Sequence, residues 1–160
     1  MRPVFIAIAI LAAAPAYGAG LIWVGGQWAA IDRGSSCEAG ARSIRIAAKG
    51  KVQAHAGFAF DRNRNGQFFA QLSRLPRAGS TVVLTVGTQP FLLAARGDWA
   101  WSTNRTQEAA IIAAARSGGG MRVESRDQAG TRFVDRYLLD GAATAIDAAA
   151  AHCAGKMQRS

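Results

Sequence analysis

The sequence predicts a mainly β fold, an antiparallel β-sandwich or barrel of about eight short strands with two helices. Three observations lead to it. Short segments alternate apolar and polar residues, turn residues separate them, and two later stretches repeat apolar residues at helical spacing. The chain has 160 residues, half of them hydrophobic, which suits one packed domain.

The chain begins with a segment typical of a secretory signal peptide. Arg2 gives it a positive start, residues 4–14 are apolar and uncharged, and residues 15–19 are mostly small. This apolar run is too short to span about 30 Å of hydrocarbon, and no later stretch is long and apolar enough to do so. We therefore expect export and no membrane span.

We expect residues 1–18 to be the signal peptide, cleaved after Ala16 or Gly18, and residues 19–160 to form a single β-rich domain. The expected location is the periplasm, the outer membrane or the outside of the cell. In such an oxidising compartment, the two cysteines predict a disulfide between Cys37 and Cys153. Two free thiols or a shared metal ion remain the alternatives.

The first half of the domain contains mainly strand patterns. Strands are expected at residues 27–32, 42–49, 57–60 and 67–72. In the second of these, Ile44 and Ile46 alternate with Ser43 and Arg45, which predicts a half-buried strand. Asn65-Gly66 between two apolar runs predicts a hairpin turn, because both residues tolerate positive φ.

The same turn has the first half of a calcium-loop pattern. Asp61, Asn63 and Asn65 have the spacing of the oxygen ligands, and Gly66 permits the sharp turn. The twelfth position, where the pattern needs Glu, is Leu72. We therefore interpret the segment as a hairpin and expect no metal site.

The second half combines strands with two helices. Strands are expected at residues 80–86, 90–95, 99–101, 121–126 and 131–139. Asn104 is a suitable N-cap for a helix that ends at residues 118–120. A last helix is expected from residue 140 to about residue 153, with Ile146 and Cys153 on its inward face. The predicted disulfide links that helix to the N-terminal region.

The order of several motifs resembles the invasion-associated locus B family of exported bacterial proteins. The matching pieces are Gly26-Gln27-Trp28 with Cys37, Val82–Gly87, Pro90–Leu93, Asp98–Trp101, Ile111–Gly118, Met121–Val123, Gly130-Thr131, Asp135–Gly141, Ala145 and Cys153. The resemblance implies a small, β-rich, disulfide-closed envelope protein linked to host-cell colonisation. It carries over no catalytic residues and no cofactor.

The absence of catalytic motifs from the sequence favours a protein that is not an enzyme. The only imidazoles are His55 and His152, and the usual serine hydrolase, metalloprotease and phosphate-loop motifs are absent. Two cysteines are too few for a zinc ribbon. Trp23, Trp28, Trp99 and Trp101 suit core packing better than a sugar-stacking face.

The excess of basic residues is the one surface feature that indicates a ligand. Lys and Arg total 19 against 10 Asp and Glu, a net charge of +9. One cluster comprises Arg42, Arg45, Lys49 and Lys51, and a second comprises Arg62, Arg64, Arg74 and Arg77. We predict weak polyanion binding by the second cluster, whose two turns are expected to share one edge.

The expected function is therefore that of a small binding or accessory module of the cell envelope. Its partner is an anionic lipid or glycan, or an envelope or host protein. Export makes nucleic acid an unsuitable partner. A periplasmic inhibitor or chaperone-like factor is the alternative, and a hydrolase is the third choice.

Overall fold

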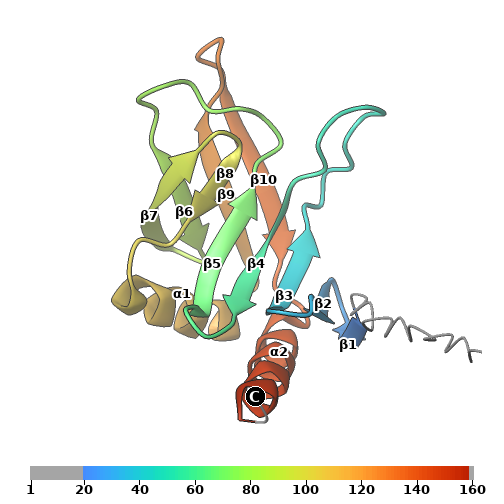
Figure 1. Cartoon of the computed structure of the whole chain (residues 1–160). Coiled ribbons are helices and arrows are strands. Elements are labelled where there is room, and N and C mark those ends of the chain that lie inside the picture. The colour runs from blue at the N-terminus through green and yellow to red at the C-terminus, as the bar shows by residue number, and fades with distance from the viewer. Residues whose placement is uncertain (1–19, 159–160) are drawn as a thin grey trace, which may run out of the picture.

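The computed structural model describes residues 20–158, so the expected signal peptide lies outside the described residues. The mainly β class and the two helices are confirmed (Figure 1), but the described chain has ten strands where about eight were predicted. The strands are β1 (Gly20–Gly25), β2 (Trp28–Asp32), β3 (Cys37–Arg42), β4 (His55–Phe60), β5 (Asn65–Gln71), β6 (Val82–Val86), β7 (Gln89–Arg96), β8 (Trp99–Trp101), β9 (Gly120–Arg126) and β10 (Arg132–Leu138). The helices are α1 (Arg105–Ser117) and α2 (Ala142–Met157).

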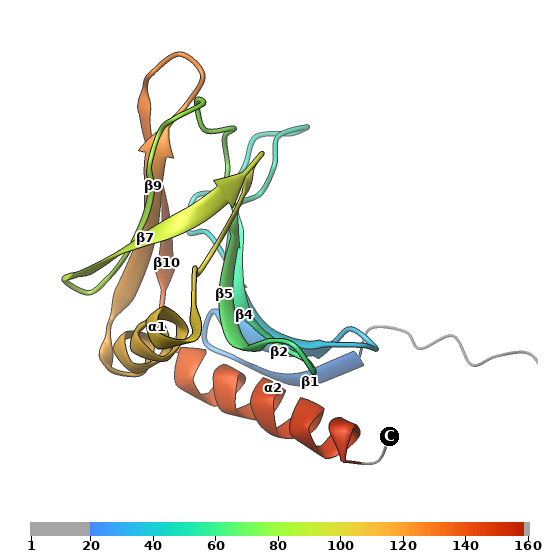
Figure 2. The ribbon, with the colours of Figure 1, turned by 60° about the vertical axis from the view of Figure 1, so that its left-hand side comes forward.

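The ten strands form one antiparallel sheet in the order β1-β2-β3-β4-β5-β8-β7-β6-β9-β10. The sheet bends so strongly that β10 approaches the chain that leaves β3, as Figure 2 shows. The Ile44 amide donates to the Arg136 carbonyl at 2.8 Å, and the Trp28 indole donates to the Leu138 carbonyl at 2.8 Å. These two bonds join β2 and the chain that leaves β3 to β10.

The predicted hairpin between β4 and β5 is confirmed, but its turn is formed by residues 61–64. Asn65 and Gly66 already belong to β5, and the pairing with β4 shifts register at Gly66. Gly66 has φ of +92°, a conformation that favours glycine, and a Cβ there would collide with Ile112 of α1. This position in the strand therefore needs glycine both for its backbone and for the close approach of a helix.

The strand predicted at residues 42–49 is wrong. The strand in this region is β3, which ends at Arg42, and residues 43–54 form a loop. Ile44 and Ile46 are 55% and 79% exposed, so they do not face the core. β3 escaped prediction because its inward residues, Ala39 and Ala41, are small. The strand β1 was not predicted either.

Both predicted helices are present. Asn104 caps α1 by accepting from the Gln107 amide at 2.9 Å, as the capping pattern predicts. α2 runs to Met157, one turn beyond the predicted end near Cys153. Ile146 and Cys153 are buried on its inward face.

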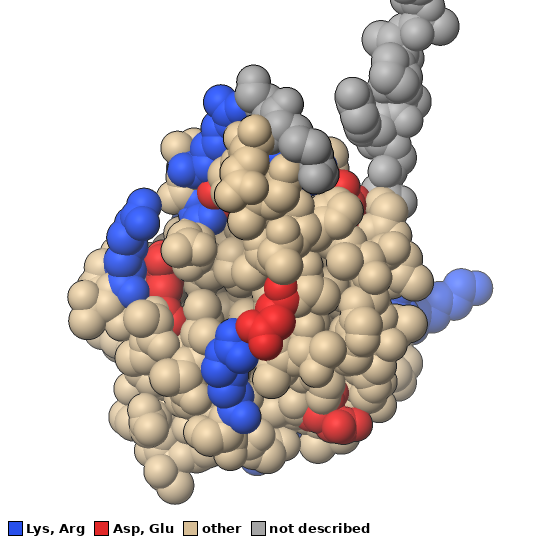
Figure 3. All heavy atoms as spheres, turned by 90° about the horizontal axis from the view of Figure 1, so that it is seen from below, with Lys and Arg blue, Asp and Glu red and all other residues tan. Residues whose placement is uncertain are grey.

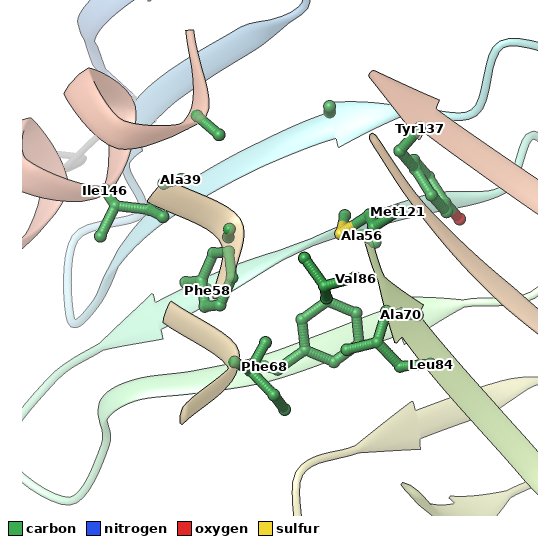
Figure 4. Packing of buried hydrophobic residues seen from close by; sticks show 14 of the residues in the cluster. Ala39, Ala56, Phe58, Phe68, Ala70, Leu84, Val86, Met121, Tyr137 and Ile146 are labelled. Carbon is green, nitrogen blue, oxygen red and sulfur yellow. The ribbon is translucent and has the colours of Figure 1, made fainter. Parts of the chain in front are cut away.

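The core lies between the bent sheet and the two helices. Figure 4 shows Phe58 and Phe68 at its centre, with Ile146 of α2 on one side. Trp28 stacks on Phe58 with ring centroids 6.0 Å apart. Val82, Leu84 and Val86 are buried and form the inward face of β6, the strand predicted at residues 80–86.

The disulfide between Cys37 and Cys153 is present and joins β3 to α2. The two cysteines are 116 residues apart and both are buried. The bond therefore closes most of the domain into one covalent loop and fixes α2 against the sheet.

We expect reduction of this disulfide to destabilise the domain substantially. Closing a loop of this size restricts the unfolded chain, which corresponds to about 4–5 kcal/mol in the chain-entropy model. Urea unfolding with and without a reductant measures the difference, and a C37S/C153S variant serves as the control because reductant cannot alter it. Two thiols titrating in the folded, unreduced protein would contradict the assignment.

Candidate functional site

The strand order decides which loops can act together. From β3 to β10 every neighbouring pair is antiparallel, so the chain alternates in direction. The connections at residues 43–54, 72–81, 97–98 and 127–131 therefore lie at one end of the sheet. α1 and α2 lie at the other end, the lower one in Figures 1 and 2.

The end of the sheet that holds these four connections is strongly basic, and we call it the basic end. It comprises the four connections and the strand residues that flank them. Its cations, all exposed, are Arg42, Arg45, Lys49, Lys51, Arg74, Arg77, Arg96, Arg126 and Arg132. Its acids are only Asp98 and Asp127, so nine cations against two acids leave a net charge of +7.

The opposite end, which we call the helical end, is nearly neutral. It carries Arg33, Arg62, Arg64, Arg105, Arg116 and Lys156 against Asp32, Asp61, Glu108, Asp140 and Asp147. Most of these cations are paired, for example Arg116 with Asp147 at 2.5 Å. Figure 3, which views the molecule from this side, shows few basic side chains, with acidic ones close to some of them. The excess positive charge is therefore concentrated at the basic end.

Most cations of the basic end lack a partner of their own. Within residues 20–158, no side-chain hydrogen bond or ion pair joins Arg42, Arg45, Lys49, Lys51, Arg77 or Arg96 to another residue. Arg74 pairs with Asp127 at 2.8 Å and Arg132 pairs with Glu124 at 2.7 Å. The unpaired cations remain available for an anionic ligand.

The loop at residues 43–54 is held in one conformation by Gln53. Its amide nitrogen donates to the Ser43 hydroxyl at 2.8 Å and to the Arg45 carbonyl at 3.1 Å. Its amide oxygen accepts from the Ala47 amide at 2.8 Å. One side chain thus satisfies backbone groups that a strand would pair with a neighbour, which explains why the alternating segment here is a loop.

The loop at residues 72–81 lies along the hairpin of β9 and β10. The Arg77 amide donates to the Arg126 carbonyl at 2.9 Å, and the Ser73 amide donates to the buried Asp135 carboxylate at 2.9 Å. The hydrogen bond from Arg74 is the main cause that lowers the pKa of Asp127. The loop is therefore fixed to the hairpin and keeps its exposed cations in place.

A polar groove of about 410 Å³ lies between this loop and the hairpin. Its lining includes three arginines, Arg77, Arg126 and Arg132, together with the hydroxyl-bearing residues Ser80 and Thr81. Glu124 also lines it. Burial acts to raise the pKa of Glu124, but hydrogen bonds from Arg132 and Arg122 outweigh it and lower that pKa. Guanidinium and hydroxyl donors together suit a phosphate or sulfate group.

The structure separates the four arginines of the predicted polyanion site. Arg74 and Arg77 belong to the basic end, whereas Arg62 and Arg64 lie in the turn before β5, at the helical end. The two turns do not share an edge, because one strand separates them. The basic end instead combines Arg74 and Arg77 with the other predicted cluster, at residues 42–51.

The calcium-like turn already uses its carboxylate internally. One oxygen of Asp61 accepts from the Asn63 amide at 2.8 Å and from the Arg64 amide at 2.7 Å. The Arg64 guanidinium pairs with the other oxygen at 2.6 Å. These contacts are those of a side-chain-capped turn, as the hairpin interpretation predicts.

Trp28, Trp99 and the two histidines have different surroundings. Trp28 is buried in the core, whereas Trp99 packs edge-on against His55 at 5.5 Å on the β4–β8 part of the sheet. His152 bonds Asp32 at 2.9 Å. Within the described residues neither imidazole forms a hydrogen bond with a serine hydroxyl, a bond that a catalytic triad requires.

A cluster of titratable side chains lies beside the disulfide. Ligand atoms of Asp32, Cys37 and His152 lie within 4.8 Å of one another, but the Cys37 sulfur is in the disulfide. Lys156 donates to Asp32 at 2.7 Å, and this hydrogen bond is the main cause that lowers the pKa of Asp32 to about 2. The cluster therefore ties the end of α2 to β2 and is structural.

This ion pair predicts a specific loss of stability in acid. Because the folded pKa of Asp32 lies below its usual 3.8, its contribution is present above about pH 4 and disappears as the pH falls towards 2. We expect D32N to lower the free energy of unfolding by about 1 kcal/mol near pH 6, a partly exposed ion pair being worth little more. Urea titrations of both proteins from pH 6 to pH 2 test this, and a difference that stays constant would contradict it.

No family model, curated protein or solved structure matches the chain in comparisons with known proteins. None of the helices within residues 20–158 is long and apolar enough to cross a membrane.

Proposed function

We propose that this protein is a non-enzymatic exported module of the cell envelope that binds anionic glycans or lipids through its basic end. The observation that carries the proposal is the separation of charge between the two ends, +7 at one and nearly neutral at the other. A compositional excess of arginine would not need to be placed at one end. The disulfide supports an oxidising location, the periplasm or the outside of the cell.

The resemblance to the invasion-associated locus B family supports the same reading. It implies a small, exported, disulfide-closed protein linked to host-cell interaction, and the surfaces involved in such contacts carry abundant phosphate and sulfate groups. A field of nine cations attracts these groups over a Debye length of about 8 Å at physiological salt. Exposed guanidinium groups then form paired hydrogen bonds with the oxygens.

A protein-binding factor is the second candidate, and one feature favours it. A groove of about 410 Å³ between α1 and α2 is lined largely by apolar side chains, including Phe60, Ile112 and Ile146. It lies at the helical end, so binding there would not depend on the basic end. The two candidates are therefore separable by mutation.

Two matched double substitutions test the leading proposal. One pair, Arg45 and Arg77, belongs to the basic end, and the other pair, Arg62 and Arg105, belongs to the helical end. All four side chains are exposed, and each double variant loses two positive charges. We expect R45Q/R77Q to elute from a heparin column at clearly lower salt than the wild type. We expect R62Q/R105Q to elute close to the wild type.

The salt dependence gives a second readout. By analogy with nucleic acid, removing two phosphate-like contacts should reduce the slope of log affinity against log salt by about 2. Equal shifts in both double variants would mean that only net charge matters. Elution of the wild type at or below physiological salt would overturn the proposal.

A further inference from the structure

Four of the nine exposed large hydrophobic side chains within residues 20–158 lie in loops of the basic end. Ile44 and Ile46 are 55% and 79% exposed, Val52 is 41% exposed and Leu75 is 50% exposed. All four lie in the loops at residues 43–54 and 72–81, next to the cations in sequence. The segments read Ile44-Arg45-Ile46, Lys51-Val52 and Arg74-Leu75.

These side chains are presented by loops that are fixed in place. Gln53 braces the first loop, and the second is bonded to the β9–β10 hairpin. The two loops also converge on neighbouring residues of β10, since Ile44 bonds the Arg136 backbone and Ser73 bonds the Asp135 carboxylate. Aliphatic side chains on hydrogen-bonded loops, each next to a cation in the sequence, differ from singly scattered surface residues, which need no explanation.

We propose that the basic end docks on an anionic lipid bilayer, with Ile44, Ile46, Val52 and Leu75 inserted at the interface. The inference rests on the proposed anion binding and names its substrate class. A sulfated glycan offers negative charge but no apolar phase for four aliphatic side chains. A bilayer offers both, and surface binding grows with buried apolar area and with attraction to anionic headgroups.

The geometry gives each group a role in this complex. The aliphatic tips enter the boundary between headgroups and acyl chains. The long side chains of Arg45, Lys49 and Lys51 extend their charged ends to the headgroup level. The groove beside Arg77 and Arg126 accepts one headgroup phosphate. The nearly neutral helical end faces away from the membrane.

The test compares aliphatic and basic variants on two ligands. The full chain is sedimented with vesicles of phosphatidylglycerol and phosphatidylcholine, and with vesicles of phosphatidylcholine alone, and is eluted from heparin. All variants share residues 1–19, so differences between them report the loops. We expect I44S/I46S to bind anionic vesicles at least about tenfold more weakly, since partial burial of two isoleucines is lost, with heparin elution unchanged. R45Q/R77Q weakens both.

A matched control removes aliphatic surface elsewhere. Leu92 and Leu138 are 58% and 45% exposed and lie outside the basic end. We expect L92S/L138S to bind both ligands like the wild type. V52S/L75S probes the same surface from other positions, so the test survives if I44S/I46S fails to fold by circular dichroism.

The outcomes separate the two proposals. Membrane docking is overturned if the protein is retained on heparin but does not bind vesicles. It is also overturned if the aliphatic variants bind vesicles as well as the wild type does. In both cases the proposed anion binding still holds. Equal binding to neutral and anionic vesicles also overturns membrane docking. Absence of binding to both heparin and anionic vesicles overturns both proposals.

Discussion

The alternation of strand direction from β3 to β10 is the constraint on which the proposed binding surface depends. It sends four connections to one end and leaves the other end to α1 and α2. The disulfide between Cys37 and Cys153 and the ion pair of Asp32 with Lys156 then hold α2 against the sheet. The helices therefore cover the helical end of the sheet. The basic end instead consists of loops that contribute few residues to the hydrophobic core.

With this division, stability and the proposed binding depend on different residues. The core relies on Trp28, Phe58 and Phe68 and on Leu84 and Val86 of β6, none of which lies at the basic end. The loops at that end keep their shape through polar contacts, above all those of Gln53 and of the Ser73 amide. Their exposed side chains can therefore change without a cavity being formed in the core.

The sequence predicts local elements better than their assembly. The hairpin of β4 and β5, the Asn104 cap and the strand β6 are decided by nearby residues, and these predictions are confirmed. The segment with Ile44 and Ile46 alternates apolar and polar residues but forms a loop. Alternation shows that the two faces of an extended segment differ in polarity. It does not show that a neighbouring strand exists to pair with the segment, because that depends on distant parts of the chain.

The candidate site follows the same division. That the surface is basic can be read from the composition, but the grouping of arginines depends on strand direction. Turns separated by one strand in an antiparallel sheet lie at opposite ends. This rule would have separated Arg62 and Arg64 from Arg74 and Arg77, and joined the latter to Arg45, Lys49 and Lys51. The exposure of the aliphatic residues required the structure.

The most direct measurement of the central claim is hydrogen–deuterium exchange of the protein with and without anionic vesicles. If the basic end binds the vesicles, we expect slower exchange in residues 43–54, 72–81 and 127–131, with little change in α1 and α2. Protection of α1 and α2 with unchanged loops would place the binding surface at the helical end and contradict the account.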